Sequence, residues 1–317
     1  MASYAFKREI PFMKYRKLML LISALLIVAS IAGIALRGLS FGIEFQGGTS
    51  IDFRQTQEVS VEQMRQALIE AGETNPVVQS SVSEGSVGLL VRTSTTDPNI
   101  AAAHAASAAS KLNLPSDSYQ VTTIGPDWGA DVSKSSLIAF VVAIGLIIIW
   151  ISIRFEFKMS LTAVASLFHD LIIICGVYAW TGHEITPNVI AALLTIMGYS
   201  LYDTVVVFHR INENAQSTHD AEHKTFFKIS NLSLNEVFMR TINTTVTSLV
   251  PVLAMLFVGG ETLKDFAFAM SIGLILGSYS SIGIATPLFA MWKTAEPQWK
   301  KLEKKYGDKA EEAISKA

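Results

Sequence analysis

Long apolar segments alternate with short polar ones along this chain of 317 residues. A helix needs about 17–25 apolar residues to cross the hydrocarbon core of a bilayer, and six segments reach that length. They lie at 18–36, 136–153, 161–180, 189–208, 237–258 and 266–292. Half of all residues are hydrophobic and only 16% are charged, which is typical of integral membrane proteins. The pattern therefore predicts an α-helical membrane protein with six transmembrane helices.

Basic residues flank the predicted helices on one side. Clusters of lysine and arginine precede the first helix, follow the last and separate the second from the third. They are Lys7, Arg8, Lys14, Arg16 and Lys17, then Lys293, Lys300, Lys301, Lys304 and Lys305, and Arg154 with Lys158. Because such clusters stay in the cytoplasm, we expect residues 1–17 and 294–317 there, and 37–135 on the far side. A cleaved signal peptide is the alternative for 18–36, but its apolar core is longer than such signals have.

Residues 37–135 have the composition of a soluble domain. Strand-like alternation at 49–54, 76–82, 86–93 and 119–124 is interrupted by two helical patterns. Ser60 with Gln63 predicts a capping box for the first helix, and Asp97-Pro98 begins the second, which runs to Leu112. Glu84-Gly85 fits a hairpin turn. This order predicts a small ferredoxin-like α+β domain between helices 1 and 2, above a five-helix bundle at 136–293.

Other segments carry little chemistry. Residues 212–236 are polar and contain His219 and His223, but no third metal ligand stands at a suitable spacing, so we expect a solvated connector. Cys175 is the only cysteine, and no phosphate-binding loop of the Walker or Rossmann type occurs. We expect no cofactor and no metal, and energy from a source other than ATP hydrolysis by this chain.

Ionisable residues inside the apolar segments are the strongest functional signal. His169 and Asp170 lie in the third segment, Asp203 lies in the fourth and Arg240 in the fifth. A carboxylate at a helix centre costs roughly 2.5–3.5 kcal/mol on insertion scales, so such residues usually have a function. The short connection between the fourth and fifth segments places Asp203 and Arg240 at similar depth, where they can pair. Such a pair changes its proton affinity when helices shift, which is what a proton switch requires.

Simpler interpretations exist for each of these residues. Arg240 can be a boundary residue that extends to the headgroups, and His169 can be a hydrogen-bonded core histidine. Two intramembrane aspartates also raise an enzymatic alternative, because Tyr202-Asp203 is similar to the Tyr-Asp of intramembrane aspartyl proteases. Those enzymes need a second aspartate in a Gly-x-Gly-Asp motif, which this chain lacks. We therefore expect a protein that is not an enzyme.

Three motifs resemble the SecD/SecF family in the same order and in matching topological places. They are residues Phe41–Thr49, similar to the family's Gly-Gly signature, residues Gly198–Val207, similar to its fourth-span motif, and residues His209–Asn214. Six spans and one modest external domain match the smaller subunit of this pair. The sequence departs from the usual pattern at Glu44, Gln46 and Tyr202, where aspartate, threonine and asparagine are common.

The resemblance implies an accessory subunit of the Sec translocase. Such a subunit pairs with SecD, resembles half of a resistance-nodulation-division transporter, and uses the proton motive force to promote preprotein export through SecYEG across the bacterial inner membrane. YajC and YidC are further partners, and no nucleic acid is expected. The family implies proton coupling at Asp203 and Arg240, with Asp170 and His169 as our further candidates.

The Gly-Gly signature supplies the candidate hinge residues Gly42, Glu44, Gly47 and Gly48. Glycine adopts positive φ freely, so Gly47 and Gly48 suit a tight entry from membrane into domain. Two other functions remain open, namely a scaffold that only stabilises its partners, and a proton-coupled exporter of small molecules. Half-size architecture disfavours the exporter, because such transporters usually need both pseudo-symmetric halves.

Overall fold

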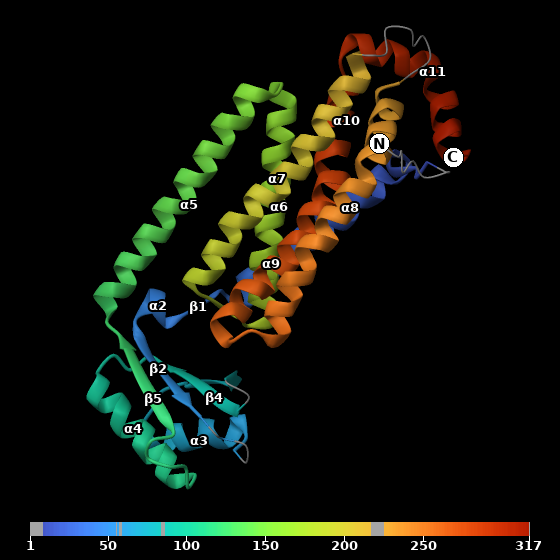
Figure 1. Ribbon diagram of the computed structural model, residues 1–317. Helices are drawn as coiled ribbons and strands as arrows, with labels where there is room; N and C mark the ends of the chain where they lie inside the picture. The colour runs from blue at the N-terminus through green and yellow to red at the C-terminus, as the bar shows by residue number, and fades with distance from the viewer. Residues whose placement is uncertain (1–8, 55, 57–58, 84–85, 217–224, 317) are drawn as a thin grey trace.

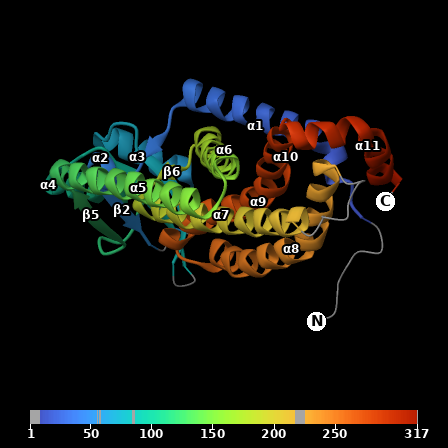
Figure 2. The same ribbon diagram turned by 90° about the horizontal axis from the view of Figure 1, so that it is seen from above.

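The protein has two parts, a bundle of long helices and a small α+β domain at one end of it (Figure 1). This computed structural model describes residues 9–316 apart from 55, 57–58, 84–85 and 217–224. Six helical segments in the described residues are long and apolar enough to cross a membrane, which confirms the expected fold class. Figure 2 shows the bundle and the domain lying end to end.

Six long helical segments of the described residues form the bundle. They are α1 (Arg16–Arg37, after the short η1 Phe12–Tyr15), α5 (Pro126–Arg154), α6 (Phe157–Thr181), α7 (Pro187–Gln216), α8 (Phe226–Val258) and α9 (Glu261–Ser280), which continues through a π-helical turn η2 (Ser281–Ala285) into α10 (Thr286–Thr294). After a break at residues 295–296 follows α11 (Pro297–Lys316).

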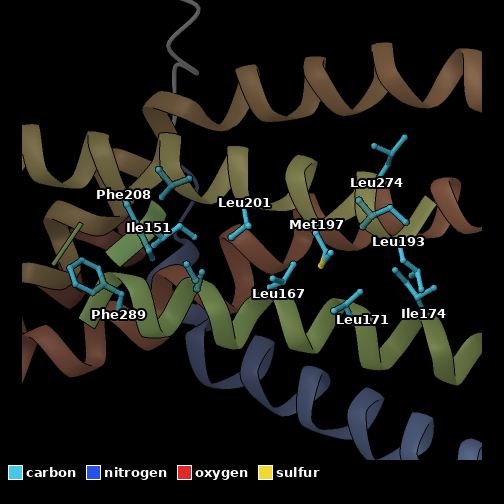
Figure 3. Close-up of a cluster of buried hydrophobic side chains, with 14 of the residues drawn as sticks. Ile151, Leu167, Leu171, Ile174, Leu193, Met197, Leu201, Phe208, Leu274 and Phe289 are labelled. Atoms are coloured by element: carbon cyan, nitrogen blue, oxygen red, sulfur yellow. The ribbon is translucent and has the colours of Figure 1, made fainter. Parts of the chain in front are cut away.

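The centre of the bundle consists of α6, α7 and the segment from α9 to α10. Between 50% and 67% of their most apolar windows is buried within the protein, against 6% to 17% for α1, α5 and α8. Leu167 and Leu171 from α6 lie toward Met197 and Leu193 from α7 in the buried cluster (Figure 3). The outer helices therefore bury little of their apolar surface within this chain and present it to lipid or to partner helices.

The small domain has the predicted ferredoxin-like topology. Its elements are β2 (Gly48–Phe53), α3 (Val61–Ala71), β3 (Val77–Ser83), β4 (Ser86–Thr93), α4 (Pro98–Lys111) and β5 (Tyr119–Ile124). The sheet order is β3-β4-β2-β5, with every neighbouring pair antiparallel. Buried side chains of both helices and of the sheet form one core, which includes Phe53, Met64 and Leu68.

Local sequence signals fixed the helix starts of this domain. Ser60 and Gln63 form the predicted reciprocal capping box at the start of α3. Asp97 accepts hydrogen bonds from the backbone N–H groups of Asn99 and Ile100, with Pro98 at the first helical position of α4. The predicted turn at Glu84-Gly85 lies outside the described residues.

Two predicted boundaries were wrong. The first is the start of the fifth long helix: α8 begins at Phe226 rather than at 237, and α7 continues to Gln216, so the two ends of the polar segment 212–236 are helical and not a solvated connector. The apolar residues Phe226, Ile229 and Leu234 are buried, while Ser230 and Ser233 donate to carbonyls four residues earlier in the same helix. Polar composition therefore did not prevent residues 226–236 from forming a largely buried part of α8. His219 and His223 lie outside the described residues.

The second wrong boundary is the start of the second long helix. This helix, α5, begins at Pro126 rather than at 136, because Gly125 and Pro126 provide a favourable helix start ten residues before the apolar run. Its polar first turns pack against the short helix α2 (Ile43–Gln46), where Gly129 lies under the carbonyl of Phe45. The sheet domain is therefore joined to the bundle by α5 itself.

A two-stranded parallel ladder forms the junction between the two parts. Strand β1 (Ser40–Phe41) follows α1, and β6 (Glu184–Ile185) lies in the connection from α6 to α7. The chain then passes through α2 and the two glycines into β2. Gly47 has φ +77° and Gly48 has φ +141°, a backbone conformation that residues with a Cβ rarely adopt.

Candidate functional site

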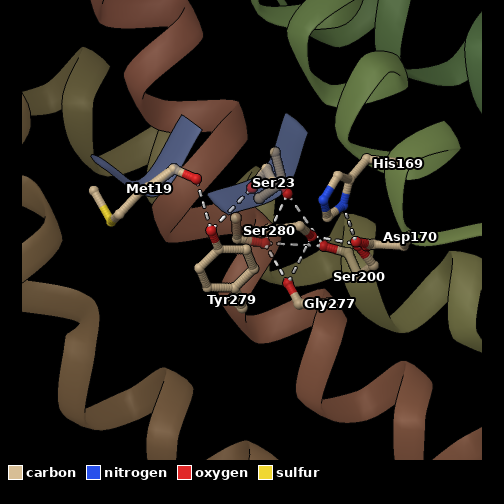
Figure 4. A network of polar contacts seen from close by, with 10 residues as sticks. Met19, Ser23, His169, Asp170, Ser200, Gly277, Tyr279 and Ser280 are labelled. Carbon is tan, nitrogen blue, oxygen red and sulfur yellow. Dashed lines mark hydrogen bonds and ion pairs between the residues drawn. The ribbon is translucent and has the colours of Figure 1, made fainter. Parts of the chain in front are cut away.

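A polar network occupies the centre of the otherwise apolar bundle (Figure 4). Its residues come from α1, α6, α7, and the region where α9 passes into the π-helical turn. Polar groups in a hydrocarbon layer must find partners within the protein, because no water is available to them. The network is therefore a candidate site for proton binding within the bundle.

Asp170 is the centre of this network, and its side chain is fully buried. Its Oδ2 accepts hydrogen bonds from Ser200 Oγ of α7 and Ser280 Oγ of α9, both at 2.7 Å. Its Oδ1 lies 3.0 Å from Nδ1 of the neighbouring His169, and the tautomer with its proton on Nδ1 donates to the carboxylate. Both oxygens are thus satisfied by donors from three helices. The arrangement holds α6, α7 and α9 together.

The π-helical turn brings further hydroxyl groups into the network. Thr204 Oγ1 and Ser281 Oγ lie 2.8 Å apart, and Thr286 donates at 2.8 Å to the carbonyl of Ser281, at the start of the π turn. On the other side, Tyr279 donates to the carbonyl of Met19 in α1 at 2.9 Å. A π-bulge inside a long helix is rare and frequently marks a functional site.

Asp203 differs from Asp170 in lacking partners. It lies on α7 one turn beyond Ser200, and only 3% of its surface is exposed. Its Oδ2 is buried and has no hydrogen-bond partner among the described residues. A buried charge without a donor is costly, so Asp203 is the carboxyl group of this site whose charge no hydrogen bond among the described residues compensates.

The predicted ion pair between Asp203 and Arg240 is not formed. Arg240 instead donates from Nη2 to the hydroxyl of Tyr202 at 2.5 Å, with its guanidinium carbon 5.6 Å from the centre of the tyrosine ring. Successive residues on a helix point about 100° apart. Asp203 therefore faces the core while Tyr202, half exposed, faces outward with Arg240. The two helices are adjacent as predicted, but the partner is the preceding residue.

The hydroxyl donors of the network were not predicted from the sequence. Ser200, Ser280, Ser281 and Thr204 are small polar residues that occur in helices of every kind, and no spacing in the sequence singled them out. Ser280 and Ser281 come from a distant part of the chain. The contact of Ser280 with Asp170 and that of Ser281 with Thr204 depend on the packing of α9 and the π-helical turn against α6 and α7, which no local pattern reveals.

The candidate hinge residues lie together at the junction. The N–H of Gly42 donates to the carbonyl of Ile185 at 2.9 Å, and a side chain at position 42 would collide with Oε2 of Glu44. A Cβ at position 48 would collide with the carbonyl of Thr93, and one at position 47 would lie 3.1 Å from the backbone of Pro126. Close backbone approach as well as φ therefore favours glycine at positions 47 and 48, whereas at position 42 a side chain would only displace the flexible end of Glu44.

Metal binding finds no support in the described residues, where no three histidine, cysteine, aspartate or glutamate side chains gather in a way that could hold an ion.

Comparison with known proteins agrees with this architecture. The family model for the C-terminal region of the protein export membrane proteins SecD and SecF matches residues 105–295, and the SecD/SecF GG motif matches residues 32–57. The protein translocase subunit SecF of Streptomyces coelicolor is 38% identical over 93% of this chain and 79% of its own length. SecF of Desulfurispirillum indicum is 34% identical, with 93% and 96% covered.

A solved structure shows the same fold. The crystal structure of SecDF from Thermus thermophilus, a translocon-associated membrane protein, superposes with a TM-score of 0.81 and 30% identity. The match covers 91% of this chain and 39% of that one, so this chain corresponds to about two fifths of the SecDF polypeptide. A multi-pass membrane protein with the family's two motifs and its fold is a member of that family, and the chain accordingly belongs to the SecD/SecF protein-export membrane proteins.

Proposed function

We propose that this chain is an accessory subunit of the Sec protein translocase that works together with SecD and is driven by the proton motive force. The observation that supports the proton step is the buried carboxyl group of Asp203, which has an unpartnered oxygen while the nearby Asp170 is fully satisfied. A carboxyl group without fixed donors responds strongly to the approach or departure of a positive charge.

Arg240 provides the movable positive charge. In the arrangement described here it donates to Tyr202, on the outer side of α7. A small rotation or shift of α8 against α7 would exchange the tyrosine hydroxyl for the carboxylate of Asp203. The first arrangement favours protonated Asp203, and the second favours the ionised form. Proton uptake and release are thereby linked to helix position, as reciprocal coupling requires.

The partner surface is a polar face on the outside of α7 and α8. Tyr202, Arg240 and Asn243 are exposed there, in the middle of long apolar helices. Such residues normally face other helices or water in a membrane, not acyl chains. No carboxylate among the described residues forms an ion pair with Arg240, so we propose that a SecD subunit covers this face and supplies an acidic group to it.

The remaining assignments follow the family and the charge distribution. We propose the bacterial inner membrane as the location, with both termini in the cytoplasm because the basic clusters flank those ends. SecYEG and the translocating preprotein are the proposed working partners, with YajC and YidC as further ones. The proposed cycle needs only protons and helix movement, so the subunit acts without a cofactor and without covalent catalysis.

The deciding experiment separates a proton-driven subunit from a scaffold. Asp203→Asn keeps the shape of the side chain but cannot titrate, so it should accumulate normally and lose gradient-stimulated translocation. Preprotein translocation is measured in proteoliposomes that contain the partner subunits, with and without an imposed proton gradient. Asn243→Ala is the control for altered assembly, because it changes the exposed polar face of α7 and α8 but removes no ionisable group. Full gradient stimulation of Asp203→Asn would show that the chain acts as a scaffold.

A further inference from the structure

A cluster of charged side chains connects the sheet domain to the membrane bundle. Arg92 from β4 approaches Oε2 of Glu184 in β6 through Nη1 at 2.7 Å, and Oδ2 of Asp265 at the start of α9 through Nη2 at 3.9 Å. The Arg92 and Glu184 side chains are only 13% and 10% exposed. Ion pairs this well shielded are sensitive to the loss of either partner, unlike exposed pairs.

The elements that hold these carboxylates also carry the polar network. Glu184 lies between the end of α6 and the start of α7, and Asp265 lies in the first turns of α9. The same three helices carry Asp170, Ser200 and Ser280, and α7 carries Asp203. A rigid helix transmits a shift at one end to the residues along it. Movement at the junction therefore shifts the residues of the polar network, and movement in the network shifts the junction.

The covalent connection beside this cluster suits a pivot. The chain enters the domain through Gly47 and Gly48, which both have positive φ, and leaves it through Gly125 into α5. Glycines permit changes of backbone angle that other residues resist. Contacts across the junction then fix the domain at its observed angle, and the pairs of Arg92 with Glu184 and Asp265 are the ionic contacts among them.

We propose that Arg92, Glu184 and Asp265 form an electrostatic latch, which positions the sheet domain on the ends of the three helices that carry the polar network. This goes beyond the proposed function, because the position of the domain is defined without a gradient and without a preprotein.

The charges around Glu184 determine how the latch responds to pH. Burial raises the pKa of Glu184, and Glu44 and Asp265 raise it further, while Arg92 opposes them. His183, the next residue, stacks on Phe268, and burial lowers its pKa, so it adds no positive charge near neutrality. An open junction would expose Glu184 to water and return its pKa to the ordinary range. The closed junction thus binds the proton more tightly than the open one.

The sign follows from linkage between proton binding and conformation. Because the closed junction has the higher proton affinity, acidification favours closure. A rise in pH through the raised pKa of Glu184 favours opening. Protonated Glu184 still has a carbonyl oxygen that accepts a hydrogen bond from Arg92, so proton uptake keeps the contact while it removes one of three crowded negative charges.

The test measures the angle of the domain directly. With Cys175, the only cysteine, replaced by alanine, spin labels are placed at Asp117 in the domain and Val258 at the end of α8, both exposed. Electron–electron double resonance then gives their distance distribution for the full chain in proteoliposomes. Arg92→Ala should shift the distribution to new, broader distances. Arg54→Ala removes an exposed arginine of the same sheet domain that pairs with Asp52, and should leave it unchanged.

Four further variants make the result decisive. Arg92→Glu should open the junction, and Arg92→Glu combined with Glu184→Arg should close it again, which a general folding defect would not allow. In Glu184→Gln the amide oxygen can still accept from Arg92, so the junction should stay closed. The protein with Glu184 should show a narrower distance distribution in acid because acidification favours closure, and Glu184→Gln should not show this change. Asp203→Asn should keep the latch, so that failure of the proton site and failure of the latch are distinguished. Distances for Arg92→Ala and Arg92→Glu that equal those of Arg54→Ala would overturn the proposal.

Discussion

The two aspartates inside the bundle occupy similar surroundings but have opposite hydrogen-bond status. Asp170 and Asp203 are both buried, at 0% and 3% exposure. Asp170 accepts from Ser200, Ser280 and His169, whereas Asp203 has a buried oxygen without any partner among the described residues. Burial alone therefore does not identify a functional carboxylate in a membrane.

The difference suggests different roles for the two side chains. Asp170 keeps its hydrogen-bond donors in every arrangement that holds α6, α7 and α9 together. The buried oxygen of Asp203 has no donor among the described residues, so we propose that its charge depends on a group that moves, namely Arg240 on the neighbouring helix. We therefore expect substitutions at Asp170 to act on stability and substitutions at Asp203 to act on function.

The largest expected effect is the loss of stability in Asp170→Leu. This change leaves the hydroxyl of Ser200 and Nδ1 of His169 without a partner in an apolar core and leaves Ser280 only its bond to the carbonyl of Gly277. Breaking a buried charged cluster costs roughly 3–5 kcal/mol. Asp203→Leu strands no donor among the described residues and should keep or raise stability. Thermal unfolding of the purified variants in the same detergent measures both. Equal losses for the two leucine variants would contradict the distinction.

A smaller loss is expected for Ser280→Ala, which removes one donor from the carboxylate of Asp170. A hydrogen bond to a charged group contributes about 1.5–3 kcal/mol. Ser271→Ala in the same helix is the matched control, because the hydroxyl of Ser271 is buried without a partner among the described residues. Its removal should be neutral or stabilising in the same unfolding assay. The comparison fails if both alanine variants lose the same stability.

The smallest effect is expected for Tyr202→Phe. The hydroxyl that accepts from Arg240 is lost, but the ring remains beneath the guanidinium, so the change should cost about 0.5–1.5 kcal/mol. A double-mutant cycle with Arg240→Met measures the coupling of the two side chains. A coupling energy indistinguishable from zero would mean that Arg240 is not held by Tyr202 and approaches another group instead.

Much of this architecture could be predicted from the chain because the signals are local. Apolar length alone identifies six helices, and Ser60, Gln63, Asp97 and Pro98 mark helix starts through contacts within three residues. The start of α8 at Phe226 could not be predicted in this way. Its polar residues are satisfied by the carbonyls of their own helix, so a polar composition coexists with burial.

The site was harder to predict than the fold because its geometry is set by long-range packing. The charged residues Asp170, Asp203 and Arg240 were visible in the sequence, and adjacency of α7 and α8 was expected from the short connection. Which carboxylate receives donors depends on where Ser280 arrives, 110 positions beyond Asp170 in the chain. The choice of Tyr202 over Asp203 as the partner of Arg240 depends on the rotation of α7 about its axis.

The central claim is that Asp203, and not Asp170, is the carboxyl group of the bundle that exchanges a proton. Infrared difference spectroscopy of the full chain in lipid tests it directly, since a carboxylic acid that gains or loses its proton shows a C=O stretching band that a carboxylate lacks. In a Glu184→Gln background, which removes the other shielded carboxyl group that takes up a proton, acid-minus-base spectra should contain a band from a buried carboxylic acid. Asp203→Asn should abolish this band, and Asp170→Asn should retain it. A band that persists in Asp203→Asn, or that disappears only in Asp170→Asn, would contradict the account.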